Sequence, residues 1–151
     1  MRAVIGLAFG LLFAAADLAR ADAPAPPPAD VHALADQFFT EVKDGHAADA
    51  FRSAMVGYAP VIDEKSVNTA GTRVEEQLRR FGPVIDWSLI STTTVAPAYV
   101  EQVYMVRCAL APMFFRLNFY TAGSKWRIID IVFNTNAEQA GYRPPPAGAG
   151  R

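Results

Sequence analysis

The sequence is poor in the residues that build metal and redox sites. Its 151 residues include one cysteine and two histidines, and no HxH or CxxC spacing brings such residues together. The sequence therefore predicts no metal site. Cys108 has no second cysteine to pair with, so an intramolecular disulfide is excluded and packing must hold the core together. In an apolar strand this cysteine is expected to be a small buried residue.

Basic clusters and catalytic motifs are absent too. The formal net charge is −1 and no basic cluster is larger than the pair Arg79-Arg80, so the basic surface of a nucleic-acid-binding protein is missing. The chain has no glycine-rich phosphate loop and no GxSxG nucleophile motif, and we predict no cofactor. With 52% hydrophobic and 19% charged residues, the composition indicates a globular domain whose activity no motif reveals.

Long hydrophobic runs are absent except at the N-terminus. Met1-Arg2 supplies a positive charge, residues 3–16 are uninterruptedly apolar, and Ala19-Arg20-Ala21 matches the small-x-small pattern of a cleavage site. We therefore predict that residues 1–21 are a signal peptide and that the protein is periplasmic or secreted. A retained membrane anchor is the alternative, but the run is shorter than the about 20 residues that span a bilayer. No stable membrane insertion is expected after cleavage.

Composition divides the rest of the chain into three parts. Residues 22–29, DAPAPPPA, form a Pro/Ala-rich linker, which can form neither a helix nor a central strand. Residues 30–136 carry regular apolar patterns and are predicted to form one domain. Residues 137–151 lack an apolar period and are predicted to be a disordered tail.

Three helices are expected at the start of the domain. Apolar residues recur at helical spacing over residues 31–43 and 47–55, and Gly45 separates the two helices. A third helix begins at Asp63, which can cap it, and ends at Gly82-Pro83. A bend or an interruption of this helix is expected at Gly71-Thr72, because these residues cost a helix about 1 kcal/mol.

Four strands follow, with apolar residues at a period of two. They are expected at residues 84–94 and 99–110 and around Phe114 and Trp126, joined by turns short enough to force an antiparallel meander. Simple alternation in the last strand places Asp130 on one face with Trp126 and Ile128. Together these elements predict an α+β fold, with three N-terminal helices packed on a curved four-stranded antiparallel sheet in the shape of a cone.

The order of the elements and the apolar positions resemble the nuclear-transport-factor-2-like (cystatin-like α+β) superfamily, in particular its small exported bacterial members of unassigned function. The residues that carry the resemblance are Phe38-Phe39, Gly45 to Phe51, Leu78 to Gly82, and Gly123 to Ile131. The resemblance covers residues 30–136 and implies the cone-shaped fold. It implies no particular activity, because related folds carry many functions.

One functional hypothesis is a small enzyme that uses no cofactor. Relatives of this kind include isomerases, cyclases and dehydratases that place Asp, His and Tyr inside the cone, where a buried carboxyl exchanges protons with a substrate. The candidates here are Asp130, Asp86 and Tyr104. His32 and His46 fall in the first helical turn and the interhelical loop, where neither suits this chemistry. The simpler interpretation of Asp130 is a carboxylate near a sheet edge, or one paired with Arg107, Arg116 or Arg127.

The preferred hypothesis is a non-catalytic binding or accessory domain, which holds a small apolar ligand in the cone or a protein partner on the sheet. A set of aromatic residues could line the cavity, the alternative being a solid core. The set is Phe38, Trp87, Tyr104, Phe115, Phe119 and Trp126. The sheet face that the helices leave open would carry several of either Trp126, Ile128 and Val132 or Ile129, Ile131 and Phe133. Such a face predicts a two-fold homodimer through the sheet, unless curvature and the tail 137–151 hide it.

The predicted signal peptide leads to the first testable prediction. Cleavage in the native host should leave Asp22 as the first residue, because Ala19 and Ala21 fill the small-residue positions of the cleavage site. N-terminal sequencing of the protein from the envelope or the medium measures this. An intact Met1 in those fractions would contradict cleavage and favour the membrane anchor.

Overall fold

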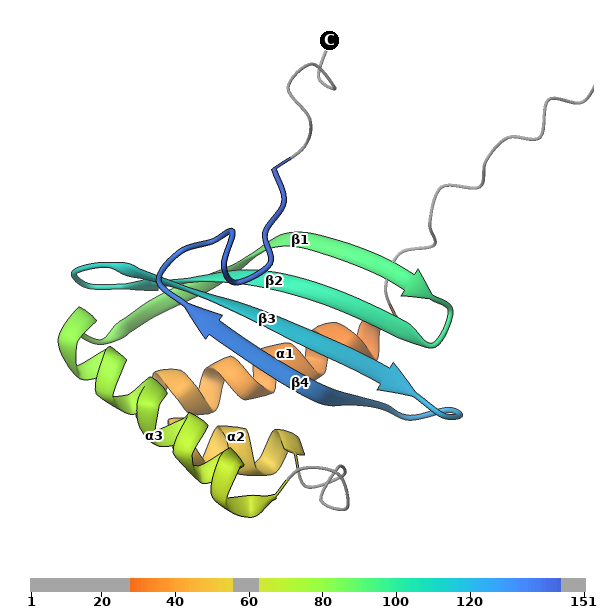
Figure 1. The fold of residues 1–151 in the computed structure, drawn as a ribbon, viewed down its shortest axis with the longest axis horizontal. Coiled ribbons are helices and arrows are strands. Elements are labelled where there is room, and N and C mark those ends of the chain that lie inside the picture. Colours follow the sequence, from red (N-terminus) through yellow and green to blue (C-terminus); the bar gives the residue numbers. More distant parts are fainter. Residues whose placement is uncertain (1–27, 56–62, 145–151) are drawn as a thin grey trace, which may run out of the picture.

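The computed structural model describes residues 28–55 and 63–144. The predicted signal peptide, nearly all of the linker and residues 145–151 lie outside these ranges. Three helices come first and four strands follow (Figure 1), which is the predicted α+β order. No helix in the described part of the chain is long and apolar enough to cross a membrane.

The helices agree with the predicted ones to within two residues at each end; they are α1 (Ala29–Lys43), α2 (Ala47–Met55) and α3 (Glu64–Phe81). Asp63 caps α3 as predicted, its carboxylate accepting from the hydroxyl of Ser66 and, at 3.0 Å, from the backbone N–H of Ser66. These hydrogen bonds lower the pKa of Asp63. The N-terminus of α2 is capped by a neighbouring helix, because Glu75 accepts the backbone N–H of Ala48 at 3.1 Å.

Gly71 does not interrupt α3, which is continuous through this position. The glycine instead allows α2 and α3 to pack closely. A Cβ atom added to Gly71 would lie 2.5 Å from the Cα of Ala48, much closer than any carbon contact. Glycine weakens an isolated helix, but Gly71 is required here because α2 packs directly against it.

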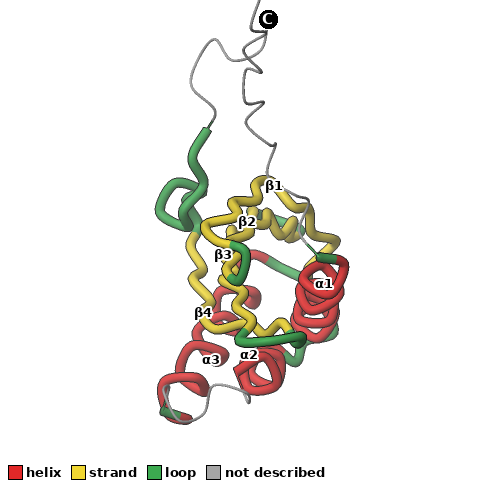
Figure 2. Tube along the Cα trace, turned by 90° about the vertical axis from the view of Figure 1, so that its right-hand side faces the viewer, coloured by secondary structure: helices red, strands yellow, loops and turns green. Residues whose placement is uncertain are grey.

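The four strands form one antiparallel sheet in sequence order; they are β1 (Val84–Ala96), β2 (Tyr99–Cys108), β3 (Pro112–Thr121) and β4 (Trp126–Asn134). β1 and β4 are its edges. Figure 2 shows the strands as an arc that opens toward α1. Three irregularities in the β1–β2 pairing and one in the β3–β4 pairing bend the strands locally. The prediction of three helices on a curved four-stranded antiparallel sheet is confirmed.

An extra residue in β4 changes which of its side chains face the helices. Two successive residues of β3 pair with Asp130 and Ile128, so Ile129 has no partner on β3. Alternation therefore changes phase across this bulge. Trp126 and Ile128 pack against the core, whereas Asp130 lies on the opposite face. The shared face expected for these three residues is wrong, because alternation within one strand does not reveal a bulge.

The core lies between α1 and the concave face of the sheet, and aromatic rings fill it. Phe39 is at its centre, with ring centroids 4.9 Å from Tyr104, 5.7 Å from Trp87 and 5.5 Å from Phe115. Phe115 and Phe119 are fully buried. The middle of the cone is therefore packed with side chains in the way of an ordinary protein interior.

The segment after β4 differs from the predicted disordered tail. Residues 135–144, here called the strap, form a compact turn in which the backbone N–H of Ala140 donates to the carbonyl of Asn136 at 3.0 Å. Ala140 is fully buried, and Gly141 lies against Arg116 of β3. Figure 2 shows the strap on the side of the sheet opposite α1. Composition missed this contact because one small apolar side chain and one glycine make it.

The contact between α2 and α3 predicts that Gly71→Ala destabilises the fold. A Gly-to-Ala change inside a helix ordinarily stabilises it by about 1 kcal/mol, but here the added methyl group meets the backbone of α2 and should cost about 1–3 kcal/mol. Urea unfolding measures the difference. Gly123→Ala is the control, because a Cβ there has open space. A Gly71→Ala variant as stable as the control would mean that the helices separate without cost.

Candidate functional site

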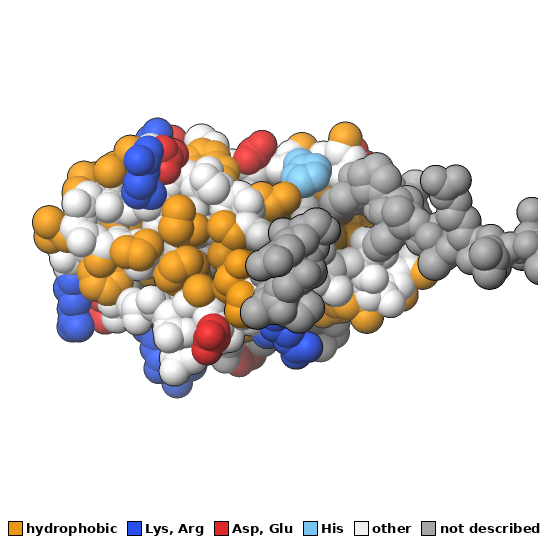
Figure 3. Space-filling view, turned by 90° about the horizontal axis from the view of Figure 1, so that it is seen from above, with side chains coloured by type: hydrophobic (Ala, Val, Ile, Leu, Met, Phe, Trp, Pro, Cys, Tyr) orange, Lys and Arg blue, Asp and Glu red, His pale blue; other side chains and the backbone are white. Residues whose placement is uncertain are grey.

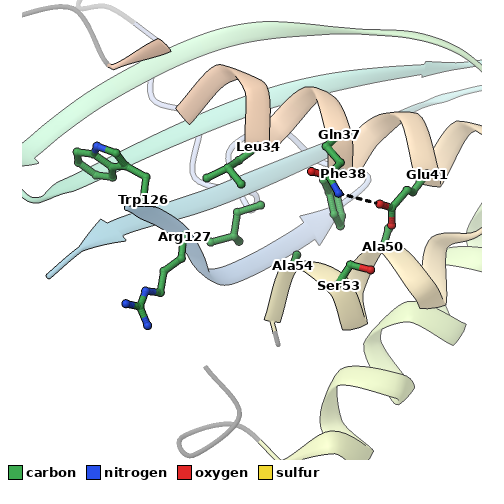
Figure 4. A pocket seen from close by; sticks show the side chains of 10 residues that line it. Leu34, Gln37, Phe38, Glu41, Ala50, Ser53, Ala54, Trp126 and Arg127 are labelled. Atoms are coloured by element: carbon green, nitrogen blue, oxygen red, sulfur yellow. Dashed lines mark hydrogen bonds between the residues drawn. The ribbon is translucent and has the colours of Figure 1, made fainter. Parts of the chain in front are cut away.

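A hollow of about 180 Å³ lies between α1, α2 and the start of β4. Its floor is apolar and includes Leu34, Phe38 and Ile128. Figure 4 shows Leu34 and Phe38 projecting from α1 toward the other two elements, with Ala50 and Ala54 facing them from α2. The small alanine side chains leave the space that larger residues fill elsewhere in the cone.

The rim of the hollow is polar. Gln37 donates to the Glu41 carboxylate at 3.2 Å along one face of α1. Ser53 of α2 and Arg127 of β4 complete the rim, and Arg127 extends away from the apolar floor (Figure 4). An apolar floor with a few polar groups around its mouth is typical of small binding sites.

Two of the six predicted pocket residues, Phe38 and Trp126, line this hollow. Of the other four, Tyr104, Phe115 and Phe119 lie in the packed interior, and Trp87 is partly buried against it. Phe115 and Phe119 are fully buried. The ring of Trp87 packs near Phe39, and its indole N–H donates to Asp36 at 3.0 Å. The hollow is therefore at the mouth of the cone rather than along its axis.

Asp86 lies on the outer face of the sheet, which we define as the face turned away from α1. Arg107 of β2 binds it through two hydrogen bonds, one of them from Nε to Oδ1 at 2.9 Å. These bonds hold the pKa of Asp86 below its usual value and raise that of Arg107. Asp86 is thus half-exposed and paired with an arginine at the β1 edge.

Asp130 lies on the outer face near the other edge. Its half-exposed carboxylate accepts the side-chain amide of Asn118 at 2.9 Å, and Nη2 of Arg116 lies 3.7 Å from the same oxygen. Tyr104 faces the core from the other side of the sheet. The structure therefore does not bring Tyr104 together with either Asp86 or Asp130.

The hydroxyl of Tyr104 has a partner that sequence reasoning missed. It donates to Oε1 of Gln102 at 2.7 Å inside the cone, where Gln102 has no exposed surface. Burial, and secondarily the charge of Asp36, raise the pKa of Tyr104. The one signal in the sequence is a polar residue at an inward position of β2. Nε2 of Gln102 is buried without a partner among the described residues.

Cys108 is buried and does not line the hollow. Burial raises the pKa of its thiol, the reverse of what a reactive cysteine requires. Within residues 28–55 and 63–144, no three His, Cys, Asp or Glu side chains gather into a group that could hold a metal ion.

Four of the five exposed large apolar side chains among the described residues lie along β1 or beside its start, away from the hollow, and the fifth is Tyr120 of β3. Ile85, Leu89 and Val95 belong to β1, with 46%, 40% and 64% of their surface exposed. Leu110 lies beside the start of β1, where its backbone N–H donates to the carbonyl of Phe81 at 2.8 Å. Figure 3 looks down on this side and shows hydrophobic side chains gathered there. Such a patch is a second surface at which partners could bind.

Comparison with known proteins identifies the fold. No protein-family model matches the chain, and no curated protein sequence matches it. A crystal structure from Campylobacter jejuni, of a protein provisionally named an NTF2-like transpeptidase, superposes with a TM-score of 0.52. The match covers 65% of this chain and 95% of that one, at 15% sequence identity. The chain has an NTF2-like fold. At this identity the similarity establishes the NTF2-like architecture and leaves the activity open.

The buried Tyr104–Gln102 pair generates a prediction. Tyr104→Phe should destabilise the protein by about 1–3 kcal/mol, because it leaves Oε1 of Gln102 buried without a donor. Adding Gln102→Leu should recover part of this loss, because both polar groups are then gone. Urea unfolding of the single and double variants measures the coupling. Additive effects would show that the two side chains act independently.

Proposed function

We propose that this NTF2-like chain is an exported, non-catalytic binding domain that holds one small apolar group in the α1–α2–β4 hollow. The observation that carries the proposal is the composition of the hollow, with its apolar floor and a rim that includes Glu41 and Arg127. Apolar contact supplies affinity in such a site, and polar groups at the mouth orient the ligand. An acid and a base on one rim suit a neutral amide or a zwitterion.

The size of the hollow limits what it holds. Pockets that enclose a drug-sized molecule measure about 300–1,000 Å³, whereas this one measures about 180 Å³. That volume suits a single apolar side chain or a short alkyl group. A partner's side chain, anchored in the hollow with its backbone amide at the polar rim, is the occupant that we favour.

The cellular location in this proposal is periplasmic or secreted. It is supported by the sequence pattern of residues 1–21, a positive charge followed by an apolar run and a small-residue cleavage site. The Pro/Ala-rich residues 22–29 would then join the domain to the new N-terminus. The cleavage experiment given above tests this part of the proposal independently of binding.

Catalytic alternatives have less support from the geometry. An isomerase, cyclase or dehydratase of the kind considered above needs a carboxyl near a tyrosine in a cavity, and Asp86 and Asp130 lie on the face opposite Tyr104. The name of the Campylobacter protein suggests acyl transfer, which needs an activated nucleophile. Ser53 lines the hollow, but no histidine lines it with Ser53.

We retain self-association through the sheet in the proposal, but the interface residues differ from those that the sequence suggested. Trp126 and Ile128 pack against the core and cannot form the interface. The apolar side chains that the register places on the outer face are Val103, Met105, Phe114 and Val132. A homodimer would bury them, and light scattering of the purified chain across micromolar concentrations tests this.

Binding in the hollow can be followed through Trp126. The chain has two tryptophans, so Trp87→Phe leaves Trp126 as the single indole fluorophore. Titration with N-acetyl-leucinamide should change its emission, whereas N-acetyl-glycinamide, which lacks the apolar side chain, should not. Native mass spectrometry of the purified chain would show in addition whether a small molecule is retained.

Matched variants decide where the probe binds. Ala54→Phe should fill the hollow and weaken binding about tenfold or more, which corresponds to about 1.4 kcal/mol. Thr69→Phe, on the exposed face of α3, should leave binding unchanged. Equal affinity in both variants, or no response to N-acetyl-leucinamide, would contradict the proposal.

A further inference from the structure

The outer face of the sheet has an ordered pattern of side chains. The strand register aligns residues of neighbouring strands in rows across the sheet. In order along β2 the rows contain Asp86, Arg107 and Pro112; Ser88, Met105, Phe114 and Asn134; Ser91, Val103, Arg116 and Val132; Thr93, Glu101, Asn118 and Asp130; and Ala96, Tyr99, Tyr120 and Arg127. The second and third rows contain the apolar side chains Met105, Phe114, Val103 and Val132 together with Arg116, and the row on either side of these two carries charge.

The strap lies on this face, at the row that contains Arg116. Val103 and Ala140 are both buried, yet neither belongs to the main core, which lies on the other side of the sheet. A Cβ atom on Gly141 would lie 3.0 Å from Cδ of Arg116, and Gly141 has a φ of +100° that other residues rarely adopt. The chain thus covers part of its own outer face with its C-terminal segment.

The outer face contains buried polar groups without partners. Among the described residues, Nε of Arg116 and Oδ1 of Asn118 are buried without hydrogen-bond partners. The ion pairs of Arg116 are long, 3.8 Å to Glu101 and 3.7 Å to Asp130, beyond hydrogen-bond distance. The backbone hydrogen bonds of the strap lie within residues 136–142. Because unpaired buried groups cost free energy, the covered state of this face carries a cost.

Without the strap, the face is complementary to itself. A two-fold axis that crosses the strands between the second and third rows places β2 of one copy over β2 of the other. Arg107 then lies opposite Glu101, and Met105 lies opposite Val103. On β3 the same axis places Phe114 opposite Arg116, an arrangement that favours a cation–π contact. The opposite charges of Arg107 and Glu101 meet on either side of these two rows, and apolar side chains meet between them.

We propose that the strap is a displaceable cover of this surface, and that a second copy of the chain takes its place on the outer face. The inference rests on the homodimer of the proposed function and adds how its formation is controlled. In the covered state Gly141 occupies the position that Phe114 of a second copy would take on Arg116. Release of the strap and association of two copies are therefore coupled.

Displacement of the strap in the full-length chain tests the coupling. Gly141→Val should force the strap off, because the new side chain is strained at this φ and collides with Arg116. Analytical ultracentrifugation should then show a dimer dissociation constant about tenfold or more below that of the unchanged chain. Ala140→Glu should act in the same way through burial of a charge. Gly123→Val, in open space, is the control and should change nothing.

Charge reversal tests the surface. In the Gly141→Val background, Arg107→Glu should abolish the dimer by setting two acids against each other, and addition of Glu101→Arg should restore it. Loss of the Asp86–Arg107 pair within one copy would not be repaired by a change at Glu101, so restoration distinguishes an intermolecular contact from a structural one. Asp86→Asn is the control and should leave the dimer intact.

The outcomes separate the two parts of the proposal. If the unchanged chain and Gly141→Val dimerise with equal dissociation constants, the control by the strap is wrong and the dimer stands. If neither strap variant dimerises while both melt as folded proteins in circular dichroism, the dimer is wrong as well. A dimer that resists Arg107→Glu would use another surface and would overturn the assignment to the outer face.

Discussion

The rest of the structure depends on the packing of Phe38 and Phe39 of α1 into the concave face of the sheet. Neighbouring residues on a helix point about 100° apart, so the two rings reach different parts of the cone. Phe39 packs toward β1 and β2 through Trp87 and Tyr104, and Phe38 packs toward α2 through Phe51, with ring centroids 5.3 Å apart. Together the two rings hold α1 against both the sheet and α2.

This packing decides where function can lie. Large aromatic residues fill the interior beside Phe39, whereas Phe38 faces the alanines of α2, and the hollow forms there. The other two candidate surfaces are on the outside of the fold. One lies along the β1 edge, and the other is the outer face, which the strap covers in part. The candidate sites therefore lie at the mouth of the cone and on the outside of the sheet, and not along the axis of the cone.

The candidate site was predictable only in part. Phe38 and Trp126 stand out as aromatic residues in apolar segments, and both line the hollow. The position of Asp130 on the edge strand β4, beside Arg116, agrees with the simpler interpretation of that aspartate. The rim gave no signal and the buried Gln102 only a weak one, because a polar residue in a strand or on a helix looks the same in the sequence whether it faces water, a hollow or the core.

The sequence by itself determined the order of helices and strands, their ends, the antiparallel meander and the cap at Asp63. These features follow from periodicity, glycine and proline positions and short turns, which are local properties of the chain. Tertiary structure alone decided the bulge at Ile129, the close contact at Gly71 and the position of the strap. In each case the outcome depends on a partner distant in sequence: the pairing with β3, the backbone of α2 and the side chain of Arg116. Local patterns carry no information about such partners, and therefore the face on which Asp130 lies could not be read from its own strand.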